Sequence, residues 1–371
     1  MAALLKDLYN KKYINSLALD ISKFYVPFDI SSFTNHIFDL SWNNLELKQR
    51  MRRISSTIGI FIPLSYKEQI NILIKTYNHS QISAENRKDN LGLENLIYSD
   101  FVQVYGLDDF NTSMIAIECF TINSSAEFAI REFILKYENK TMVQMEMWTK
   151  SNNEHLRRLA SEGCRPRLPW ANALIIYKKD PTKVLNILEL IQDDTSLYVK
   201  KSIANNLNDI SKDHPNIVIK IAKKWYGQNK DKNWIIKHAL RTLLKQGNIE
   251  VLKIFGYTPK QNIQIENFTI NKDIKIGDNL DFSFILRDKD ILGNIRIEYS
   301  IDFVRLNGKS NNKVFFISQK EFKTEMHKIN KKHSFKLINT RKYYSGIHYI
   351  NIILNGIIIH KQKFNFIGND I

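Results

Sequence analysis

The sequence is poor in the residues and runs that mark several common classes of protein. Its 371 residues include two cysteines, Cys119 and Cys164, which are too few for a disulfide framework and have no partner at metal-ligand spacing. No apolar run approaches the roughly 18 residues of a membrane span. The first residues lack the apolar core of a signal peptide, and no glycine-rich phosphate loop occurs. We therefore expect a reduced, cytoplasmic protein with no metal, no cofactor and no membrane contact.

Acidic residues are also scarce relative to basic ones. Lysine and arginine together number 54 against 38 for aspartate and glutamate, which gives a net charge of +16. Residues 258–371 hold 19 basic and 11 acidic side chains, a surplus of +8, and residues 1–257 carry the other +8. A surplus spread over both halves suits a long polyanion such as DNA. A lysine-rich composition from an AT-rich genome would give the same excess, so the charge alone decides little.

The periodicity of the apolar residues changes near Gly256. Before it, apolar residues recur at helical spacing, and helices are predicted after Pro181, from Pro215 to about Trp225, and from Lys232 to Lys245. After it the period is two, in the runs 282–286, 295–301, 314–317, 348–354 and 357–366.

Asn355-Gly356, between the last two runs, is a strong hairpin signal. We predict a mainly α protein in two domains, each with its own core. Residues 1–257 form a helical domain, and residues 258–371 form an immunoglobulin-like β-sandwich of about seven strands.

Three stretches of the helical part share one pattern, an apolar residue, a basic residue, and then small or apolar residues. They are Leu156–Ala160, Val199–Ala204 and Ile236–Leu240, at spacings of roughly 40 residues, which is within the range of HEAT-like repeats. Each such repeat is a helix pair that buries its apolar face only against its neighbours. Stacked pairs form a concave face against which DNA could lie, although an ordinary helical bundle could show the same three matches.

The stretch Asn153–Ala171 concentrates charge on one predicted helix and at the corner after it. Glu154, Arg158 and Glu162 lie four residues apart, so they share one helix face. Ordinary surface ion pairs would give the same spacing. Gly163 can end this helix.

The next residues bring cations and an aromatic ring to the same corner. Arg165 and Arg167 flank Pro166, where the chain is stiff and extended. Pro169 is expected to open another helix with Trp170 at its start. Arginine can donate two parallel hydrogen bonds to phosphate oxygens, and tryptophan can pack against a sugar or a base. Carboxylates repel phosphate, so acids among these groups are better suited to a cation.

Two other stretches carry polar residues that could belong to a site. Ser124 or Ser125 can cap a helix that places Glu127 in its first turn, where an acid also balances the helix dipole. Hydroxyl, amide and acid groups form a stripe at helical spacing, made of Ser202, Asn205, Asn206 and Asp209. Such a stripe could face a ligand or form hydrogen bonds between helices.

Basic and aromatic residues are mixed in two tracts of the second half, Lys328–Lys336 and Thr340–Gly346. The second tract contains Arg341 and Lys342. This mixture fits nucleic-acid contact, and it fits exposed loops and edge strands guarded by lysine equally well.

Taken together, these stretches resemble the AlkC family of DNA alkylation repair proteins along nearly the whole chain. The most specific match is Arg165-Pro-Arg-Leu-Pro-Trp170, and the others are residues 45–54, 104–110, 125–131, 153–171, 199–215, 331–335 and 340–344. The resemblance implies a HEAT-like repeat fold followed by an immunoglobulin-like domain that also contacts DNA. It implies excision of 3-methyladenine and 3-methylcytosine from double-stranded DNA. We expect a monomer.

The resemblance also implies site residues, position by position. The family's site acids fall on Glu127, Glu162 and Asp209. Neighbouring residues expected to contact the substrate or DNA are Arg158, Arg165, Arg167, Trp170, Lys201, Asn206, Arg341 and Lys342. Lys200 and Lys201 stand where an arginine would be expected, which would weaken a phosphate clamp there.

This activity is also chemically reasonable on grounds that do not depend on the resemblance. An N3-alkylated adenine or cytosine carries a positive charge and is already a good leaving group, so the glycosidic bond can loosen toward an oxocarbenium-like sugar. A carboxylate stabilises that cation and positions a water molecule, with no metal and no Schiff-base lysine. The alternative is a non-catalytic helical-repeat protein that binds DNA or protein. It fits the charge and the repeats, but it leaves the acids among the arginines and Trp170 unexplained.

Overall fold

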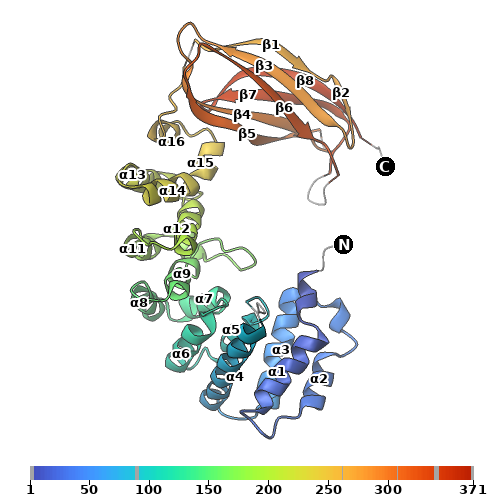
Figure 1. The fold of residues 1–371 in the computed structure, drawn as a ribbon, viewed down its shortest axis with the longest axis vertical. Coiled ribbons are helices and arrows are strands. Elements are labelled where there is room, and N and C mark those ends of the chain that lie inside the picture. The colour runs from blue at the N-terminus through green and yellow to red at the C-terminus, as the bar shows by residue number, and fades with distance from the viewer. Residues whose placement is uncertain (1–3, 88–91, 261, 307, 338–341, 369–371) are drawn as a thin grey trace. The chain divides into compact units, whose positions relative to one another are not determined.

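The computed structural model describes residues 4–87, 92–260, 262–306, 308–337 and 342–368. Helices occupy the chain as far as Ile254, and strands begin at Gln264 (Figure 1). The change of period near Gly256 therefore located the change from helix to strand correctly. Two compact units form, one of residues 1–213 and 229–239 and the other of residues 214–228 and 240–371. The domain division predicted after residue 257 stays a prediction.

The first unit consists of helices and the loops between them. Its elements are η1 (Leu5–Leu8), α1 (Lys11–Ser22), α2 (Ile30–Ile37), η2 (Trp42–Asn44), α3 (Leu47–Phe61), α4 (Tyr66–Arg87), α5 (Leu96–Tyr105), α6 (Phe110–Thr121), α7 (Glu127–Lys136), α8 (Glu138–Trp148), α9 (Glu154–Glu162), α10 (Ile175–Lys179), α11 (Thr182–Leu190), α12 (Leu197–Ile210) and α14 (Lys230–Ala239). Across the described residues, no helix has both the length and the apolar character to cross a membrane.

The three stretches with the shared apolar-basic pattern lie on α9, α12 and α14. Helix α12 packs against both of the others. Asn153 caps α9 by accepting a hydrogen bond from the His155 amide, and Ser196 caps α12 by accepting one from the Tyr198 amide. Because α12 has a neighbour on either side, most of its residues are buried, including much of its polar stripe. The stripe therefore lies inside the unit rather than on a solvent face.

One predicted helix is wrong in its extent. The apolar pattern from Lys232 to Lys245 indicated a single element, but α14 ends at Ala239 and α15 (Arg241–Lys245) follows. Leu240 separates them with φ −87 and ψ 6, which is outside the helical range. Neither glycine nor proline marks this break, so periodicity could not locate it.

The strands of the second unit form two sheets, ordered β1-β3-β6 and β2-β8-β7-β4-β5. Their bounds are β1 (Gln264–Ile270), β2 (Asp273–Lys275), β3 (Asn279–Arg287), β4 (Gly293–Val304), β5 (Ser310–Phe322), β6 (Met326–Ser334), β7 (Gly346–Leu354) and β8 (Ile357–Ile367). Alternate residues from both sheets meet in one core, for example Phe284 of β3 and Ile297 of β4. The turn at Asn355-Gly356, with φ of 46 and 82, joins β7 to β8 as predicted.

The tract Lys328–Lys336 proves to be mostly strand. It supplies most of β6, and Ile329 and His333 are buried. The lysines between them obscured the alternation. With β1 and β2, which the sequence did not reveal, the described residues contain eight strands where about seven were expected.

Three helices belong to the same unit as the strands, namely α13 (Pro215–Trp225), α15 and α16 (Ile249–Ile254). Gly247, after α15, lies against Gly356 of the β7–β8 turn. A Cβ on Gly247 would lie 3.2 Å from the Cα of Gly356, and one on Gly356 would lie 2.9 Å from the Gly247 carbonyl oxygen. Asn355 also donates a hydrogen bond of 2.6 Å to the Thr258 carbonyl. The turn is thus fastened to the chain that leads into the strands.

Candidate active site

A cavity of about 810 Å³ opens among α4, α5, α7, α9 and α12 of the first unit. Two of the three predicted site acids, Glu127 and Glu162, line it, together with Arg158 and Trp170. Aromatic and polar side chains complete much of the wall, among them Phe128, His155 and Tyr198. The fold therefore brings together, around one cavity, side chains that are far apart in the sequence.

Glu127 begins α7 and has few partners. Its Oε2 lies 3.5 Å from Nη1 of Arg158 and accepts no hydrogen bond. Burial raises the pKa of the Glu127 carboxyl above its ordinary value of 4.5, and Arg158 opposes that rise. The predicted serine cap is wrong, because Ala126 occupies the N-cap position without a side-chain bond. Instead, Ser125 Oγ accepts a hydrogen bond of 3.1 Å from Arg158, which helps to hold the guanidinium beside Glu127.

Arg158 lies between the two acids that line the cavity. Its Nη2 is 3.8 Å from Oε1 of Glu162, and its guanidinium lies over the Tyr198 ring, 4.6 Å from the centroid. Burial acts to lower the pKa of Arg158, but Glu127 and Glu162 outweigh it, and the pKa is raised. Arg158 is thus shared between two carboxylates that both line the cavity.

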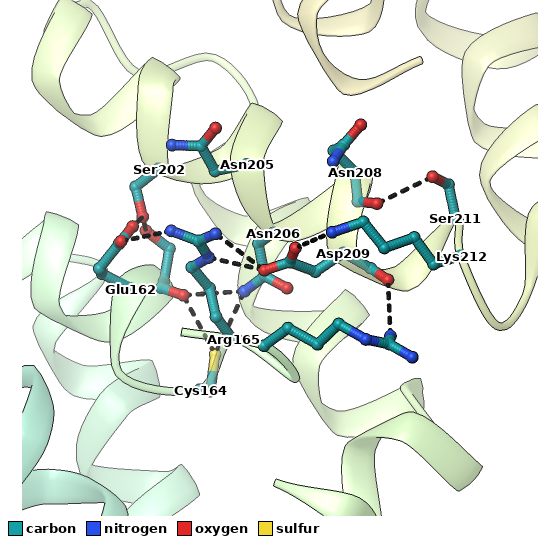
Figure 2. A network of polar contacts seen from close by, with 12 residues as sticks. Glu162, Cys164, Arg165, Ser202, Asn205, Asn206, Asn208, Asp209, Ser211 and Lys212 are labelled. Atoms are coloured by element: carbon teal, nitrogen blue, oxygen red, sulfur yellow. Dashed lines mark hydrogen bonds and ion pairs between the residues drawn. The ribbon is translucent and has the colours of Figure 1, made fainter. Parts of the chain in front are cut away.

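Figure 2 shows Glu162 and Asp209 joined through Arg165. Arg165 Nη1 donates to Glu162 Oε1 at 2.6 Å, and Arg165 Nε donates to Asp209 Oδ2 at 2.9 Å. Lys212 donates to the other oxygen of Asp209 at 2.9 Å. Asp209 is buried and is not among the residues that line the described cavity. It is linked to the cavity wall through Arg165 and Glu162. Arg165 is itself 6 % exposed, and its contact with substrate or DNA stays a prediction.

The polar stripe of α12 forms hydrogen bonds between helices, one of the two roles left open by the sequence. Ser202 Oγ donates to Glu162 Oε2 at 2.7 Å, and Asn206 donates to the Ser161 carbonyl at 2.8 Å. Asn205 contacts the neighbour on the other side of α12, because its Oδ1 lies 3.3 Å from Nε2 of His238 on α14. Asn206 is completely buried, and its expected contact with substrate or DNA stays a prediction. It ties α12 to α9 and steadies the helix that carries Glu162.

Contrary to expectation, no helix begins at Pro169. Residues 163–174 form a loop because Arg131, from α7, draws their carbonyl groups inward. Its guanidinium donates to the carbonyls of Gly163, Arg165 and Asn172 at 3.1, 2.7 and 2.6 Å. Trp170 has a left-handed backbone, with φ 62, and the residue is 60 % exposed at the cavity. Such a conformation costs a non-glycine residue about 1–3 kcal/mol and persists only where its surroundings fix it.

Arg167, Lys201 and Lys342 are not among the residues that line this cavity. Arg167 pairs with Asp213 near the end of α12, through Nη2 and Oδ1 at 2.7 Å. Lys201 is exposed on α12, whereas Lys200 is buried and pairs with Asp231 at 2.9 Å. Lys342 is exposed in the second unit, and Arg341 lies outside the described residues. DNA contact by Arg167, Lys201 and Lys342 stays a prediction.

His155 and Tyr198 also line the cavity, although the sequence did not indicate them as site residues. Their rings meet edge to face, with centroids 5.6 Å apart. Burial lowers the pKa of His155, which favours its neutral form. A signal did exist, because each residue stands two positions after the N-cap of its helix, on α9 and α12. Helices α9 and α12 carry two of the three stretches with the shared pattern and pack against each other, so their corresponding positions lie close together. Within the described residues, no three His, Cys, Asp or Glu side chains gather as a metal site would require.

Comparisons with known proteins agree with this architecture. The model of a family described as DNA alkylation repair enzyme matches residues 118–243, and that of the C-terminal Ig-like domain of uncharacterised protein YhaZ matches residues 264–368. The uncharacterized protein YhaZ of Bacillus subtilis (strain 168) is 42% identical over 355 residues, which cover 95% of this chain and 96% of YhaZ.

A solved structure is similar over almost all of the chain. It is Pseudomonas fluorescens alkylpurine DNA glycosylase AlkC bound to DNA containing an abasic site analog. Its TM-score is 0.92 at 34% identity, over 98% of this chain and 100% of that one. The helical unit with its buried acid-arginine group, followed by an Ig-like sandwich, thus defines a DNA alkylation repair protein. Within that class, the chain belongs to the AlkC-type family.

Proposed function

We propose that this protein is a monofunctional DNA glycosylase that excises cationic N3-alkylated bases, 3-methyladenine and 3-methylcytosine, from double-stranded DNA. The observation that carries the proposal is the cavity wall on which Glu127 and Glu162 share Arg158. The similar AlkC, bound to DNA with an abasic site analog, supports it, because an abasic site is what base excision leaves. We expect the protein to act as a monomer in the cytoplasm.

The three acids have different roles in this proposal. Glu162 lines the cavity and is held rigidly by Arg165 and Ser202. It stabilises the sugar cation. Glu127 is less tightly paired, and its ionised form positions the attacking water. Asp209 acts through Arg165, which it orients toward Glu162.

The size of the electrostatic effect is sufficient for catalysis. One pair of unit charges at about 4 Å interacts by about 4 kcal/mol at an effective dielectric near 20. If this attraction arises only in the transition state, the rate rises by a factor of roughly several hundred. Trp170 and Tyr198 provide aromatic faces at the same cavity that can pack against a base or a sugar. No proton is needed for a leaving group that is already cationic.

Release of free 3-methyladenine from methylated duplex DNA, followed by mass spectrometry, tests the proposal directly. Wild-type protein should release the base and leave an unbroken strand with an abasic site, since no Schiff-base lysine is involved. The double variant Glu127→Gln/Glu162→Gln is the matched control, because it keeps the shape of both side chains. DNA binding without any base release by the wild-type protein would instead indicate a non-catalytic DNA-binding protein.

A further inference from the structure

The loop that carries Trp170 is held from two sides. Arg131 binds three of its carbonyl groups from within the unit, as described above. On the other side, Lys48 donates a hydrogen bond of 2.9 Å to the carbonyl oxygen of Trp170. These two residues are 122 positions apart in the chain. The bond is therefore a tertiary contact between the first helices of the unit and the loop after α9.

Lys48 reaches Trp170 from a well-anchored position. It is the second residue of α3, where a capping box joins Glu46 to Gln49, and Glu46 also pairs with Lys6 at 3.0 Å. Its ammonium lies over the Phe128 ring, 4.5 Å from the centroid. Phe128 follows Glu127 and lines the same cavity as Trp170. One ammonium group thus contacts both the aromatic neighbour of a site acid and the backbone of the exposed aromatic residue.

The left-handed backbone of Trp170 is the reason for such a contact. At φ 62 the residue is strained, and the hydrogen bond lies on its own carbonyl group, at the strained position. Trp170 is also 60 % exposed, so burial contributes less to its position than it does for a core residue. A bond to the Trp170 carbonyl, added to those that Arg131 makes with other carbonyls of the loop, therefore limits the positions open to the indole.

We propose that Lys48 is a positioning residue, which fixes the Trp170 loop and so directs the indole at the bound nucleotide. The inference rests on the proposed glycosylase function for its consequence in excision, but the loop contact itself is independent of any activity. Lys48 is exposed, so its removal leaves no buried charge behind and should not unfold the chain.

A double-mutant cycle tests this role. The single-turnover rate of 3-methyladenine excision is measured at saturating enzyme for wild type, Lys48→Met, Trp170→Ala and the double variant. Lys48→Met should slow excision about tenfold in the wild-type background and less than about twofold in the Trp170→Ala background. Lys48→Arg should restore part of the rate, and Lys12→Met, which removes an exposed lysine from α1, should change nothing.

The rival role for Lys48 is a phosphate contact, which predicts different results. Lys48→Met would then weaken DNA binding, lower the salt slope by about one, and act equally in both backgrounds. Equal effects in the two backgrounds would overturn the proposal.

A measurement on the free protein separates this inference from the proposed function. The fluorescence of Trp170 is obtained as the difference between wild type and Trp170→Phe, and its fast local depolarisation reports the motion of the indole. Lys48→Met should increase that component, whether or not the protein excises any base. If the component is unchanged, Lys48 does not hold the loop and the inference fails. If it increases while no alkylated base is released by the wild-type protein, only the proposed glycosylase function has failed.

Discussion

Glu162 and Asp209 share one buried guanidinium, but only Glu162 lines the cavity. A substitution at Glu162 and a substitution at Asp209 are therefore expected to affect the protein in different ways. Loss of charge at Glu162 acts on the bound substrate, whereas loss of charge at Asp209 or Arg165 first acts on the network that holds Glu162. Three predictions at the scale of single residues concern Glu162, its neighbour Glu127, and the shared cation Arg165.

Glu162→Gln should slow excision of 3-methyladenine by about 10²-fold or more in single turnover at saturating enzyme. The neutral amide cannot stabilise the sugar cation, but it keeps the shape, and Arg165 keeps its bond to Asp209. Folding should therefore survive, and DNA affinity should hold or rise slightly. Glu154→Gln, on the exposed start of the same helix, is the matched control and should be neutral. A near-normal rate for Glu162→Gln would remove Glu162 from the mechanism.

The pH dependence of excision should depend on Glu127. Burial raises its pKa above 4.5, so the carboxyl takes up a proton at higher pH than a free glutamate does. Excision should fall as the pH drops through this raised pKa. The same protonation favours the folded state, because a group with a raised folded-state pKa stabilises the fold at low pH and loses that effect as the pH rises through the folded pKa. Glu127→Gln should be slow and should lack this acid limb in a single-turnover pH profile.

Arg165→Ala should destabilise the protein by about 3–5 kcal/mol, because it leaves Glu162 and Asp209 buried without their shared cation. Arg167→Ala, two residues along, removes a partly exposed pair with Asp213 and should cost less than about 1 kcal/mol. Urea denaturation of the two variants provides the comparison. Equal costs would mean that the buried network contributes no more than a surface pair.

At the scale of secondary-structure elements, the sequence was informative wherever one repeating pattern controls the structure. The helical face of Glu154, Arg158 and Glu162 and the hairpin at Asn355-Gly356 each depend on a short run of residues, and both were predicted. The conformation of Trp170 depends on Arg131, a residue 39 positions earlier, so proline-based rules placed a helix there in error. The burial of Asn206 likewise follows from α12 having α9 and α14 as neighbours. Such effects of tertiary contacts cannot be inferred from local patterns.

The sandwich should lose stability under mildly acidic conditions because of β7. His348 is completely buried near Phe303, Phe364 and Phe366, and burial lowers its pKa below 6.5. A histidine with a lowered folded-state pKa supports the fold above its unfolded pKa, and this support falls away as the pH drops below about 6.5. The protection factors of the β7 amides, which are hydrogen-exchange rates corrected for the intrinsic effect of pH, should therefore decrease between about pH 7.5 and 5.5.

His348→Phe should flatten this pH dependence, since the ring is kept and the titrating group is lost. His327→Phe serves as the control, because His327 is only half-buried and its loss should flatten the dependence less. Identical pH profiles for wild type and His348→Phe would show that another group controls the acid sensitivity of the sandwich.

At the scale of the whole molecule, half of the net charge lies in residues 258–371, while the cavity lies in the first unit. We therefore expect the strands to supply DNA affinity rather than chemistry. Replacing Lys331, Lys332 and Lys342 by glutamine in the full chain should weaken DNA binding and lower the salt slope by about one for each of these lysines that binds a phosphate group. The single-turnover rate at saturating enzyme should stay within about twofold of wild type. Unchanged affinity and salt slope would contradict this division of roles.

The close approach of Gly247 to Gly356 has a practical consequence for exchanging parts between relatives. A hybrid joined at residue 257 would place one parent's β7–β8 turn against the other parent's segment after α15, where a single added carbon atom has no room. A donor sandwich should therefore be transferred together with α15 and α16, and with residues 214–228, which belong to the same unit. A joint before His214 also transfers α14, so the donor's α14 must pack against the host's α12. Where the parents agree at that contact, hybrids joined before His214 should be obtained in soluble form more often than hybrids joined at 257, unless both parents have glycine at the two facing positions.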